Sequence, residues 1–434
     1  MLKTVEWSRK GRSNRTVNQF LARSAFPQEA ETAAAEVLAA VRARGDRAVS
    51  AYVAQFEGAH IPPKKMRVPD VDFSKAERLV PAYIKRAVND AHKRVTRFSE
   101  ASLRDGWTMK LPGGGEAGEF FTPMDRVGVY VPGGTAPLAS TAVMTVTLAK
   151  VAGVKEIVAC TPAGKTGAVT PVLLYALKVA GATEVFRVGG IQAIGMMAFG
   201  TKGCRKVQKI VGPGNAYVTA AKRQVYGHVG IDQVAGPSEI AVLADGTVSA
   251  KWVAADLLSQ AEHGSGWERS LLVTQSRGYA DDVKREMMAQ LETLSRRQLV
   301  QRVIDRDGIL FAVTPDLDQG MELVNMFAPE HLEIMCKDAK GMMKGVRAAG
   351  AVFLGAWTPE SAGDFVAGPS HVLPTGGAAS MFSGLTPDDF RRRHSFVEFS
   401  REDLSQTKDA IEAFAAVEGL DAHGRSATFR FAGG

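Results

Sequence analysis

The stretch VGVYVPGG, residues 127–134, decides the fold class of this chain. A short apolar run ends in a Pro-Gly-Gly turn, and an apolar helical pattern follows over residues 140–152. The same succession of apolar run, small-residue turn and helix starts again at three later runs: EIVAC (156–160), EVFRV (184–188) and QKIV (208–211). Repeated strand, turn and helix predict a doubly wound (Rossmann-like) parallel sheet of class α/β.

A second series of the same kind begins near residue 240 and predicts a second α/β domain. Helical patterns, one of them through residues 277–294, separate its expected strands EIAVLA (239–244), SLLVT (270–274), ILFAV (309–313) and AVFLG (351–355). Residues 356–385 are rich in Gly, Pro and Ser and show little periodicity. Because long irregular segments inside a compact protein usually serve function, we expect residues 356–385 to contribute to a site.

The two ends of the chain have helical patterns instead. Residues 29–56 and 84–103 each predict helices, with a break at Gly45, and residues 401–420 predict a helix followed by a strand-like end, ATFRF. We therefore expect two Rossmann-like sheet domains, a helical N-terminal part and a small C-terminal tail domain. The expected divisions are residues 1–127 packed with 238–385, residues 128–237, and the tail 386–434.

Composition limits the classes of function. With 45% hydrophobic and 23% charged residues, the sequence is typical of a globular protein, and it contains neither a signal-peptide core nor a membrane-length apolar run. Three widely spaced cysteines predict no disulfide framework, which favours a reducing, cytoplasmic location. The net charge of +7 includes the basic run Arg391–Arg393. Since no aromatic-studded basic motif accompanies the charge, we expect no nucleic-acid partner.

Three glycine-rich turns predict a nucleotide site. VPGGTAP (131–137), VGGIQA (188–193) and VGPGNAY (211–217) follow expected strands at their carboxyl ends, where doubly wound sheets bind ligands. Glycine permits close backbone approach, and the next helix offers unpaired N–H groups to phosphate. GGGEAG (113–118) also matches a dinucleotide-binding pattern, but it opens no helix and is interpreted as a turn between extended segments.

The stretch DLLSQAEHG (256–264) raises the question of a metal site. Gln260 and His263 are three residues apart, so they share one helix face, although both are also ordinary polar residues at a helix end. Further ligand types lie in the irregular segment and in the tail: Asp364, His371 and His423. Imidazole and carboxylate without thiolate suit zinc or a similar divalent ion.

APEHLEI (328–334) places Glu330 and His331 directly after Pro329. Because proline is favourable in a first helical turn, we expect a helix to begin here. An acid near the positive end of a helix can be purely structural, and the same pair also offers two groups for proton transfer.

Taken together, these motifs resemble the histidinol dehydrogenase family. The resemblance covers residues from about 120 to the C-terminus and rests on motifs that occur in the family's order: VGVYVPGGTAP, VGGIQAI, GPGNAYVTAAKRQV, GIDQVAGPSE, AADLLSQAEHG, FAPEHLEIM, GAVFLG, ESAGDF, GPSHVLPTGG and EGLDAHG. The helical N-terminal part matches more loosely. Such long ordered agreement is highly specific.

The resemblance implies the role of each candidate residue. It implies one zinc per subunit, bound by Gln260, His263, Asp364 and His423. It implies NAD contacts by Tyr130, Gln192 and Asn215, within the domain 128–237. It implies Glu330 and His331 as the catalytic pair, and a substrate pocket of Ser238, Gln260, His263, His331, Asp364, His371, Glu418 and His423.

It also implies an activity: NAD-dependent oxidation of L-histidinol through L-histidinal to L-histidine, the last steps of histidine biosynthesis. The implied assembly is a homodimer in which the tail completes the partner's active site, with no membrane association. Relatives also oxidise other small diols, including a sulfonated propanediol, so a sister activity is the first alternative. A non-catalytic nucleotide- or nucleic-acid-binding relative is the second, and the intact Glu330 and His331 argue against it.

Overall fold

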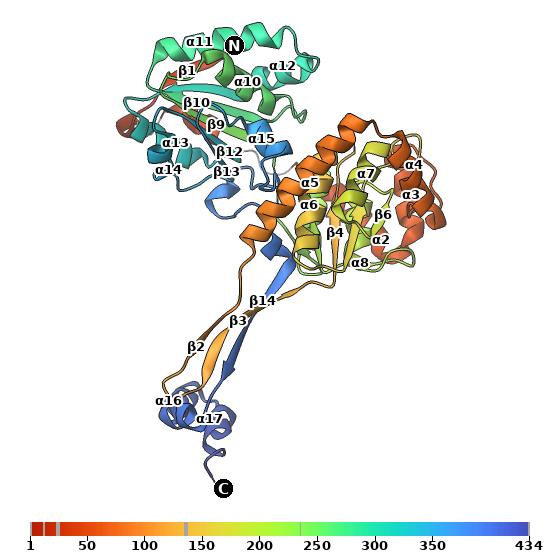
Figure 1. The fold of residues 1–434 in the computed structure, drawn as a ribbon, viewed down its shortest axis with the longest axis vertical. Helices are drawn as coiled ribbons and strands as arrows, with labels where there is room; N and C mark the ends of the chain where they lie inside the picture. The colour runs from red at the N-terminus through yellow and green to blue at the C-terminus, as the bar shows by residue number, and fades with distance from the viewer. Residues whose placement is uncertain (1, 12–13, 23–26, 134–137, 235, 433–434) are drawn as a thin grey trace. The chain divides into compact units, whose positions relative to one another are not determined.

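A computed structural model of the chain describes residues 2–11, 14–22, 27–133, 138–234 and 236–432. The chain divides into two compact units. The first unit comprises Met1–Ser102 with Asp125–Phe390, and the second comprises Leu103–Met124 with Arg391–Gly434. Two mostly buried parallel sheets form the centres of the first unit (Figure 1).

The first sheet contains the strands predicted around residue 127. Its described strands are all parallel and lie in the order β6 (Glu184–Phe186), β5 (Glu156–Cys160), β4 (Arg126–Tyr130), β7 (Lys209–Val211) and β8 (Gly230–Ile231). The chain order reverses between β4 and β7, and this switch point is where such sheets bind ligands. Gly212, with φ +115°, follows β7, and a Cβ there would lie 2.1 Å from the Tyr130 carbonyl oxygen. Only glycine permits this approach between the two strand ends.

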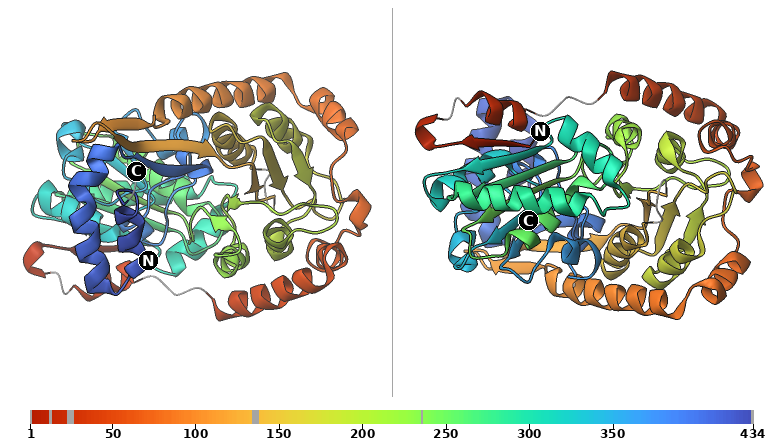
Figure 2. Two further views of the ribbon diagram at one scale, coloured as in Figure 1. Left: turned by 90° about the horizontal axis from the view of Figure 1, so that it is seen from below. Right: turned by 90° about the horizontal axis from the view of Figure 1, so that it is seen from above.

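Helices from two parts of the chain cover this sheet (Figure 2). Those between its strands are α6 (Ala139–Val151), α7 (Pro171–Ala180), α8 (Gly190–Phe199) and α9 (Ala216–Val225). Those from the N-terminal part are α2 (Gln28–Arg44), α3 (Asp46–Glu57), α4 (Asp70–Leu79) and α5 (Ala82–Ser102), with the 3-10 turn η2 (Pro63–Lys65). The predicted break at Gly45 is confirmed, since Gly45 has φ 55° and separates α2 from α3.

The expected partner of this helical part is wrong. We predicted that residues 1–127 pack with 238–385. Residues 3–6 do so, because they pair with residues 310–313. However, α2 packs on α8 and α9, α4 packs on α7, and α5 packs on α6 and α7. Val37 and Leu38 share one hydrophobic core with Ile194 and Met197 of the first sheet's helix α8. Apolar periodicity shows that a helix has a buried face, but it does not identify the sheet that buries it.

The second sheet has the same strand order with one strand added at its edge. Its described strands are parallel and lie in the order β1 (Lys3–Glu6), β11 (Ile309–Val313), β10 (Arg269–Thr274), β9 (Glu239–Ala244), β12 (His331–Met335) and β13 (Ala351–Leu354). The four predicted strands from 239 onward are confirmed. The edge strand β1 was not predicted, because four mostly polar residues have no readable pattern.

Helices cover both faces of this sheet as well. They are α10 (Ala250–Ala261), α11 (Arg277–Leu291), α12 (Arg297–Asp305), α13 (Leu317–Phe327), α14 (Ala339–Met343), α15 (Glu360–Phe365), and from the N-terminus η1 (Arg9–Gly11) and α1 (Arg15–Leu21). The irregular segment 356–385 holds only α15 and the 3-10 turn η3 (Ala378–Ser380), and the turn η4 (Pro387–Phe390) follows it. No helix of the described residues is long and apolar enough to cross a membrane.

The prediction of a helix beginning after Pro329 is wrong. Ala328 ends α13 in the left-handed region, with φ 46°, and His331 then begins strand β12. All five residues of β12 are buried because β9 and β13 pair with it on either side. His331 and Glu333 interrupt the apolar run, so a central strand resembled an amphipathic helix start.

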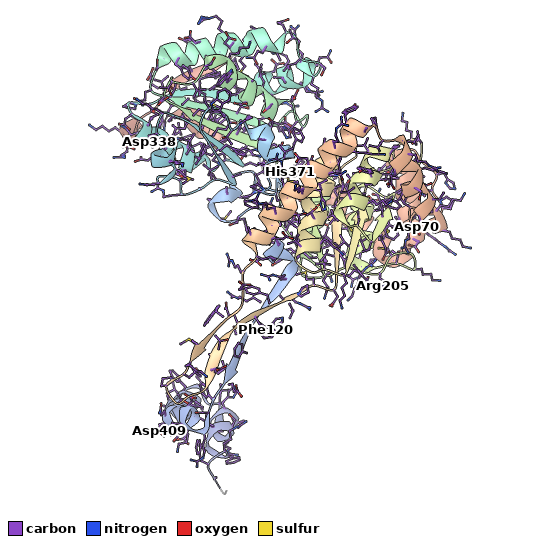
Figure 3. The ribbon with its side chains drawn as sticks, in the orientation of Figure 1. Asp70, Phe120, Arg205, Asp338, His371 and Asp409 are labelled. Atoms are coloured by element: carbon purple, nitrogen blue, oxygen red, sulfur yellow. The ribbon has the colours of Figure 1, made fainter. Side chains whose placement is uncertain are left out.

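The second unit combines an antiparallel sheet with two helices. The strands are ordered β14 (Arg391–Glu398), β3 (Glu116–Pro123) and β2 (Trp107–Lys110), and Phe120 stacks on His394 across the β3–β14 pair (Figure 3). The prediction that GGGEAG forms a turn between extended segments is confirmed, with residues 113–115 in the turn and residues 116–118 beginning β3. However, residues 103–124 belong with the tail and not with the N-terminal part, because β3 pairs with β14 along its whole length.

The end of the chain also differs from the prediction. Helix α16 (Arg401–Glu418) confirms the predicted tail helix, and Ser400 and Asp403 cap it reciprocally. ATFRF is not a strand, since α17 (Asp421–Thr428) includes its first two residues. Helix α17 packs against α16, where Gly424 approaches Ala415, and no described strand pairs with residues 427–431.

Candidate functional site

His331 lies at the start of β12 and is 2% exposed. Its Nδ1 faces two oxygens, Gln260 Oε1 at 2.8 Å and the Glu239 carbonyl at 3.3 Å. Because both oxygens accept hydrogen bonds, Nδ1 carries the proton and Nε2 keeps its lone pair. Burial lowers the pKa of His331 to about 4, so the imidazole is neutral and can accept a proton.

Glu330 precedes His331 and is also buried. Its Oε2 accepts the Glu239 main-chain N–H at 3.1 Å and lies 3.9 Å from His331 Nδ1. Burial raises the pKa of Glu330 well above its ordinary value. A carboxylate with a raised pKa is a stronger base when it ionises, which suits proton transfer near neutral pH.

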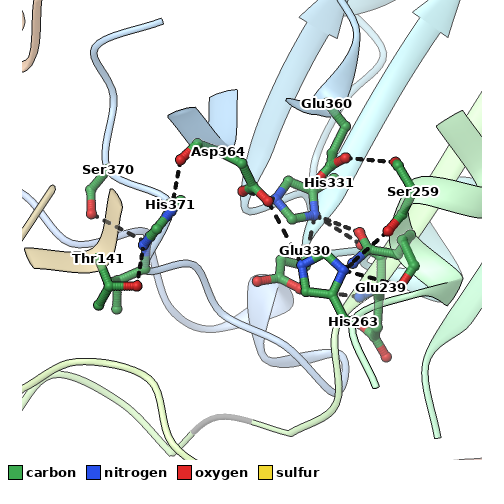
Figure 4. Close-up of polar contacts among 12 residues, drawn as sticks. Thr141, Glu239, Ser259, His263, Glu330, His331, Glu360, Asp364, Ser370 and His371 are labelled. Carbon is green, nitrogen blue, oxygen red and sulfur yellow. Dashed lines mark hydrogen bonds and ion pairs between the residues drawn. The ribbon is translucent and has the colours of Figure 1, made fainter. Parts of the chain in front are cut away.

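His263 and Asp364 form the centre of a candidate metal site (Figure 4). His263 lies just after α10, with Nδ1 3.2 Å from the carbonyls of Ser259 and Gln260, so Nε2 is directed to Asp364 Oδ2 at 3.7 Å. Burial alone would lower the pKa of His263, but the Asp364 carboxylate outweighs it and raises the pKa to about 9. Burial would raise the pKa of Asp364, and the facing histidines lower it instead.

Glu360 is a residue that sequence reasoning missed. Its carboxylate lies with His263 and Asp364 in a group whose ligand atoms are all within 4.8 Å of one another. Burial and the Asp364 charge raise the pKa of Glu360 to about 8. The signal was present in ESAGDF, because Glu360 and Asp364 are four residues apart and share one face of α15.

A cavity adjoins these groups and contains two further predicted residues. Ser238, Glu330 and His371 line it together with the glycine turn 212–214 and the buried pair Lys222–Asp232. His371 Nδ1 lies 3.0 Å from the Asp364 carbonyl, and its Nε2 lies 3.1 Å from Thr141 Oγ1. Burial lowers the pKa of His371, which favours a neutral ring facing the cavity. The structure thus groups Ser238, Gln260, His263, Glu330, His331, Asp364 and His371.

The predicted nucleotide contacts lie at the carboxyl edge of the first sheet. Tyr130 ends β4 and its hydroxyl accepts the Gly190 N–H at 3.1 Å, while burial raises the pKa of Tyr130 to about 12. Gln192 is fully buried on α8, and its Oε1 has no hydrogen-bond partner among the described residues. Asn215 caps α9 by accepting the N–H groups of Tyr217 and Val218. Residues 134–137 of the turn VPGGTAP lie outside the described residues.

Glu57 is the second residue that the sequence did not reveal. It ends α3, and its carboxylate accepts the N–H groups of Gly189 and Ala163 at 2.8 and 3.0 Å and faces Gln192 Nε2 at 3.4 Å. Burial raises its pKa. Glu57 therefore fixes the turns after β5 and β6 beside Gln192. No local pattern distinguishes it from other helical acids.

The remaining predicted residues, Glu418 and His423, belong to the second unit. Glu418 is the last residue of α16 and His423 lies in α17, and both are exposed. The group around His331 belongs to the first unit.

Comparison with known proteins identifies the family. A family model described as histidinol dehydrogenase matches residues 22–431. The chain is 42% identical to a histidinol dehydrogenase of Heliobacterium mobile over 396 residues, covering 91% of this chain and 92% of that one. It is 42% identical to that of Geobacillus kaustophilus over 403 residues, covering 93% and 94%.

A solved structure agrees with both. The fold matches the crystal structure of histidinol dehydrogenase from Elizabethkingia anophelis with a TM-score of 0.93 and 31% identity, covering 99% of this chain and 98% of that one. This chain belongs to the histidinol dehydrogenase family of oxidoreductases.

Proposed function

We propose that the protein oxidises L-histidinol through L-histidinal to L-histidine, with zinc bound in the active site and NAD as oxidant. The observation that carries this proposal is the buried neutral His331, which has Glu330 beside it. His331 Nε2 lies 3.7 Å from Asp364 Oδ1. Asp364 belongs, with His263 and Glu360, to the metal-type group, the set of side chains that could hold a metal ion. Proton acceptor, second base and cation site are the parts that such an oxidation requires.

The residues present fit a divalent metal ion. His263 Nε2 and the Asp364 carboxylate face each other, and two buried carboxylates beside one imidazole need a positive charge to offset their repulsion. Gln260 can add its amide oxygen, which has two lone pairs and so can accept from His331 and also bind the metal. His423 would be the fourth ligand. Bound zinc would hold the imidazole and amino nitrogens of the substrate.

The residues at the edge of the first sheet fit NAD. The unpartnered Gln192 Oε1 and the glycine turns beside Tyr130 and Asn215 offer polar contacts where a dinucleotide can approach the backbone. NAD, when bound, accepts the hydride of each oxidation, so two molecules are used in turn.

Asn215 gives a test that separates a structural role from a cofactor role. Asn215→Ala should lower the free energy of unfolding by about 1 kcal/mol, because the cap of α9 is lost. It should also weaken NAD binding. Asn215→Ser keeps a capping oxygen, so it should weaken NAD binding while stability stays near wild type. Urea unfolding and fluorescence titration with NAD measure the two effects, and unchanged NAD affinity in both variants would remove Asn215 from the cofactor site.

In the first oxidation, His331 takes the proton of the substrate hydroxyl at Nε2. Gln260 and the Glu239 carbonyl hold the ring by Nδ1, which fixes the tautomer that this step needs. In the second step, Glu330 removes a proton from the water that adds to the aldehyde. His331, having released its first proton to solvent, then takes the proton of the resulting diol at Nε2.

The remaining predicted residues orient the substrate. Ser238 and His371 line the cavity beside Glu330 and provide neutral polar contacts. Glu418 would accept a hydrogen bond from an N–H group of the substrate, and its negative charge favours histidinol over a sulfonated diol.

We further propose a homodimer in which the tail delivers Glu418 and His423 to the partner's site. Apolar side chains around these residues support it, because Phe414, Val417 and Phe429 are 69%, 87% and 68% exposed. A dimer that covers these side chains would remove their apolar surface from water.

The stoichiometry of the reaction tests the proposed function. Each histidinol consumed should yield two NADH, because the aldehyde stays bound between the steps. The assay follows absorbance of NADH against histidinol, with a panel of small diols and amino alcohols as comparison. A yield of one NADH with aldehyde trapped by a carbonyl reagent, or faster turnover of another diol, would contradict the assignment.

A further inference from the structure

Glu360 occupies a fixed and fully enclosed position in the metal-type group. It is 1% exposed, and its Oε2 accepts the Ser259 hydroxyl at 2.8 Å. Its main-chain N–H donates to Glu333 Oε1 at 2.6 Å, which fixes the start of α15. Hydrogen bonds therefore hold Glu360 both at its main chain and at its carboxylate, and the direction of the side chain does not depend on solvent.

The other carboxylate oxygen, Oε1, is buried and has no hydrogen-bond partner among the described residues. It belongs to the side chain that converges with His263 and Asp364, as Figure 4 shows. A buried carboxylate oxygen without a donor is unfavourable unless a cation or a proton satisfies it. Without an ion, a proton held between Glu360 and the Asp364 carboxylate satisfies this oxygen. A bound cation would replace that proton, so the unpartnered oxygen is a second observation, beside the cluster itself, that points to a cation.

The spacing of the group suits a small divalent ion. Metal–ligand distances of about 2.0–2.2 Å place tetrahedral ligand atoms roughly 3.3–3.6 Å apart. His263 Nε2 and Asp364 Oδ2 are 3.7 Å apart. One carboxylate oxygen of Glu360 lies within 4.8 Å of a ligand atom of each of these two residues. Shifts of about an ångström would bring all three side chains to one ion. The His263 side chain, 38% exposed, leaves the group accessible to an ion from solvent.

We propose that Glu360 is a metal ligand supplied by the same chain, which holds the coordination position that His423 takes once the tail is in place. This inference rests on the proposed metal centre. Gln260, His263, Asp364 and Glu360 then give one chain four donors of its own. The chain can therefore bind its metal before the site is completed by a second subunit, and Glu360 yields its position to His423 on assembly.

A double-mutant cycle on the full-length protein tests this role, with zinc affinity measured by competition against a chromophoric chelator. In wild type, Glu360→Gln should change the Kd for zinc by less than about threefold, since His423 fills the position. In the His423→Asn background, the same change should raise the Kd by about 10- to 100-fold, since no charged ligand remains for it. Absorption of the Co²⁺-loaded variants reports the change of ligand set independently of activity.

Glu262→Gln provides the matched control, because Glu262 adjoins His263 in the chain but lies outside the metal-type group. It should leave the Kd unchanged in both backgrounds. Equal effects of Glu360→Gln in the two backgrounds, or no effect in either, would overturn the proposal. If wild type itself binds no zinc, the proposed metal centre fails as a whole, and that outcome is distinct from a zinc-binding wild type with a silent Glu360→Gln. Circular dichroism of each variant confirms that the comparison is between folded proteins.

Discussion

His331→Asn should lower the rates of both oxidations by about 100- to 10,000-fold, because it removes the proton acceptor of each step. Asparagine keeps a side-chain amide near Gln260 but has no lone pair of comparable basicity at the position of Nε2. The measurement is kcat with histidinol and, separately, with histidinal as substrate. A variant that loses only one of the two activities would contradict a shared base.

Glu330→Gln is the matched comparison for His331→Asn. Its amide preserves the volume of the buried carboxyl, and its oxygen can still accept the Glu239 N–H. It should impair oxidation of histidinal more than oxidation of histidinol, because only the second step needs an activated water. Equal losses on the two substrates would show that Glu330 does not act on that water.

Mixing two inactive variants should restore activity if the site is shared between subunits. His331→Asn and His423→Asn should each inactivate a homodimer, the second because the tail then no longer completes the partner's site. In a heterodimer, one site collects both lesions and the other collects neither. Activity should therefore rise from near zero toward half of the wild-type value per heterodimer.

The control for this experiment mixes His331→Asn with Glu330→Gln. Both lesions lie in the first unit, so every site of that heterodimer keeps one of them, and the defective second step should persist. Subunit exchange is checked by pulling down a tagged subunit with its untagged partner. If exchange occurs and the first mixture stays inactive, the tail serves its own subunit and the shared-site proposal is wrong.

The sequence was sufficient for most strands of the two parallel sheets of the first unit, although not for β1, β8 and β12. Runs such as VGVYV and ILFAV are apolar throughout, since strands buried on both faces need no alternation, and glycine turns bound them. The break at Gly45 also follows from the local preference of a single residue. These features depend on neighbours in the chain, and that is why they were readable.

The sequence was insufficient where contacts with distant segments determine the secondary structure or the packing partner of a residue. Whether His331 begins a helix or a central strand depends on pairing with β9 and β13, which are distant along the chain. The N-terminal helices show an apolar face without showing which sheet covers it, and the core around Val37 and Met197 settled that. Residues 103–124 join the tail for the same reason, through their pairing with β14.

The candidate site also has features that the sequence determines and features that only the fold determines. The sequence by itself determined which chemical groups are available: the motifs around Gln260, His263, Glu330, His331 and Asp364 contain ligands and bases of the right types. Only the tertiary structure decided the protonation of these groups and which other side chains lie beside them. Burial makes the pKa of Glu330 high and that of His331 low, and packing adds Glu57 and Glu360 to the two sites. The reason is physical, since desolvation and convergence depend on what surrounds a side chain in space, and a residue's neighbours in the chain do not specify that.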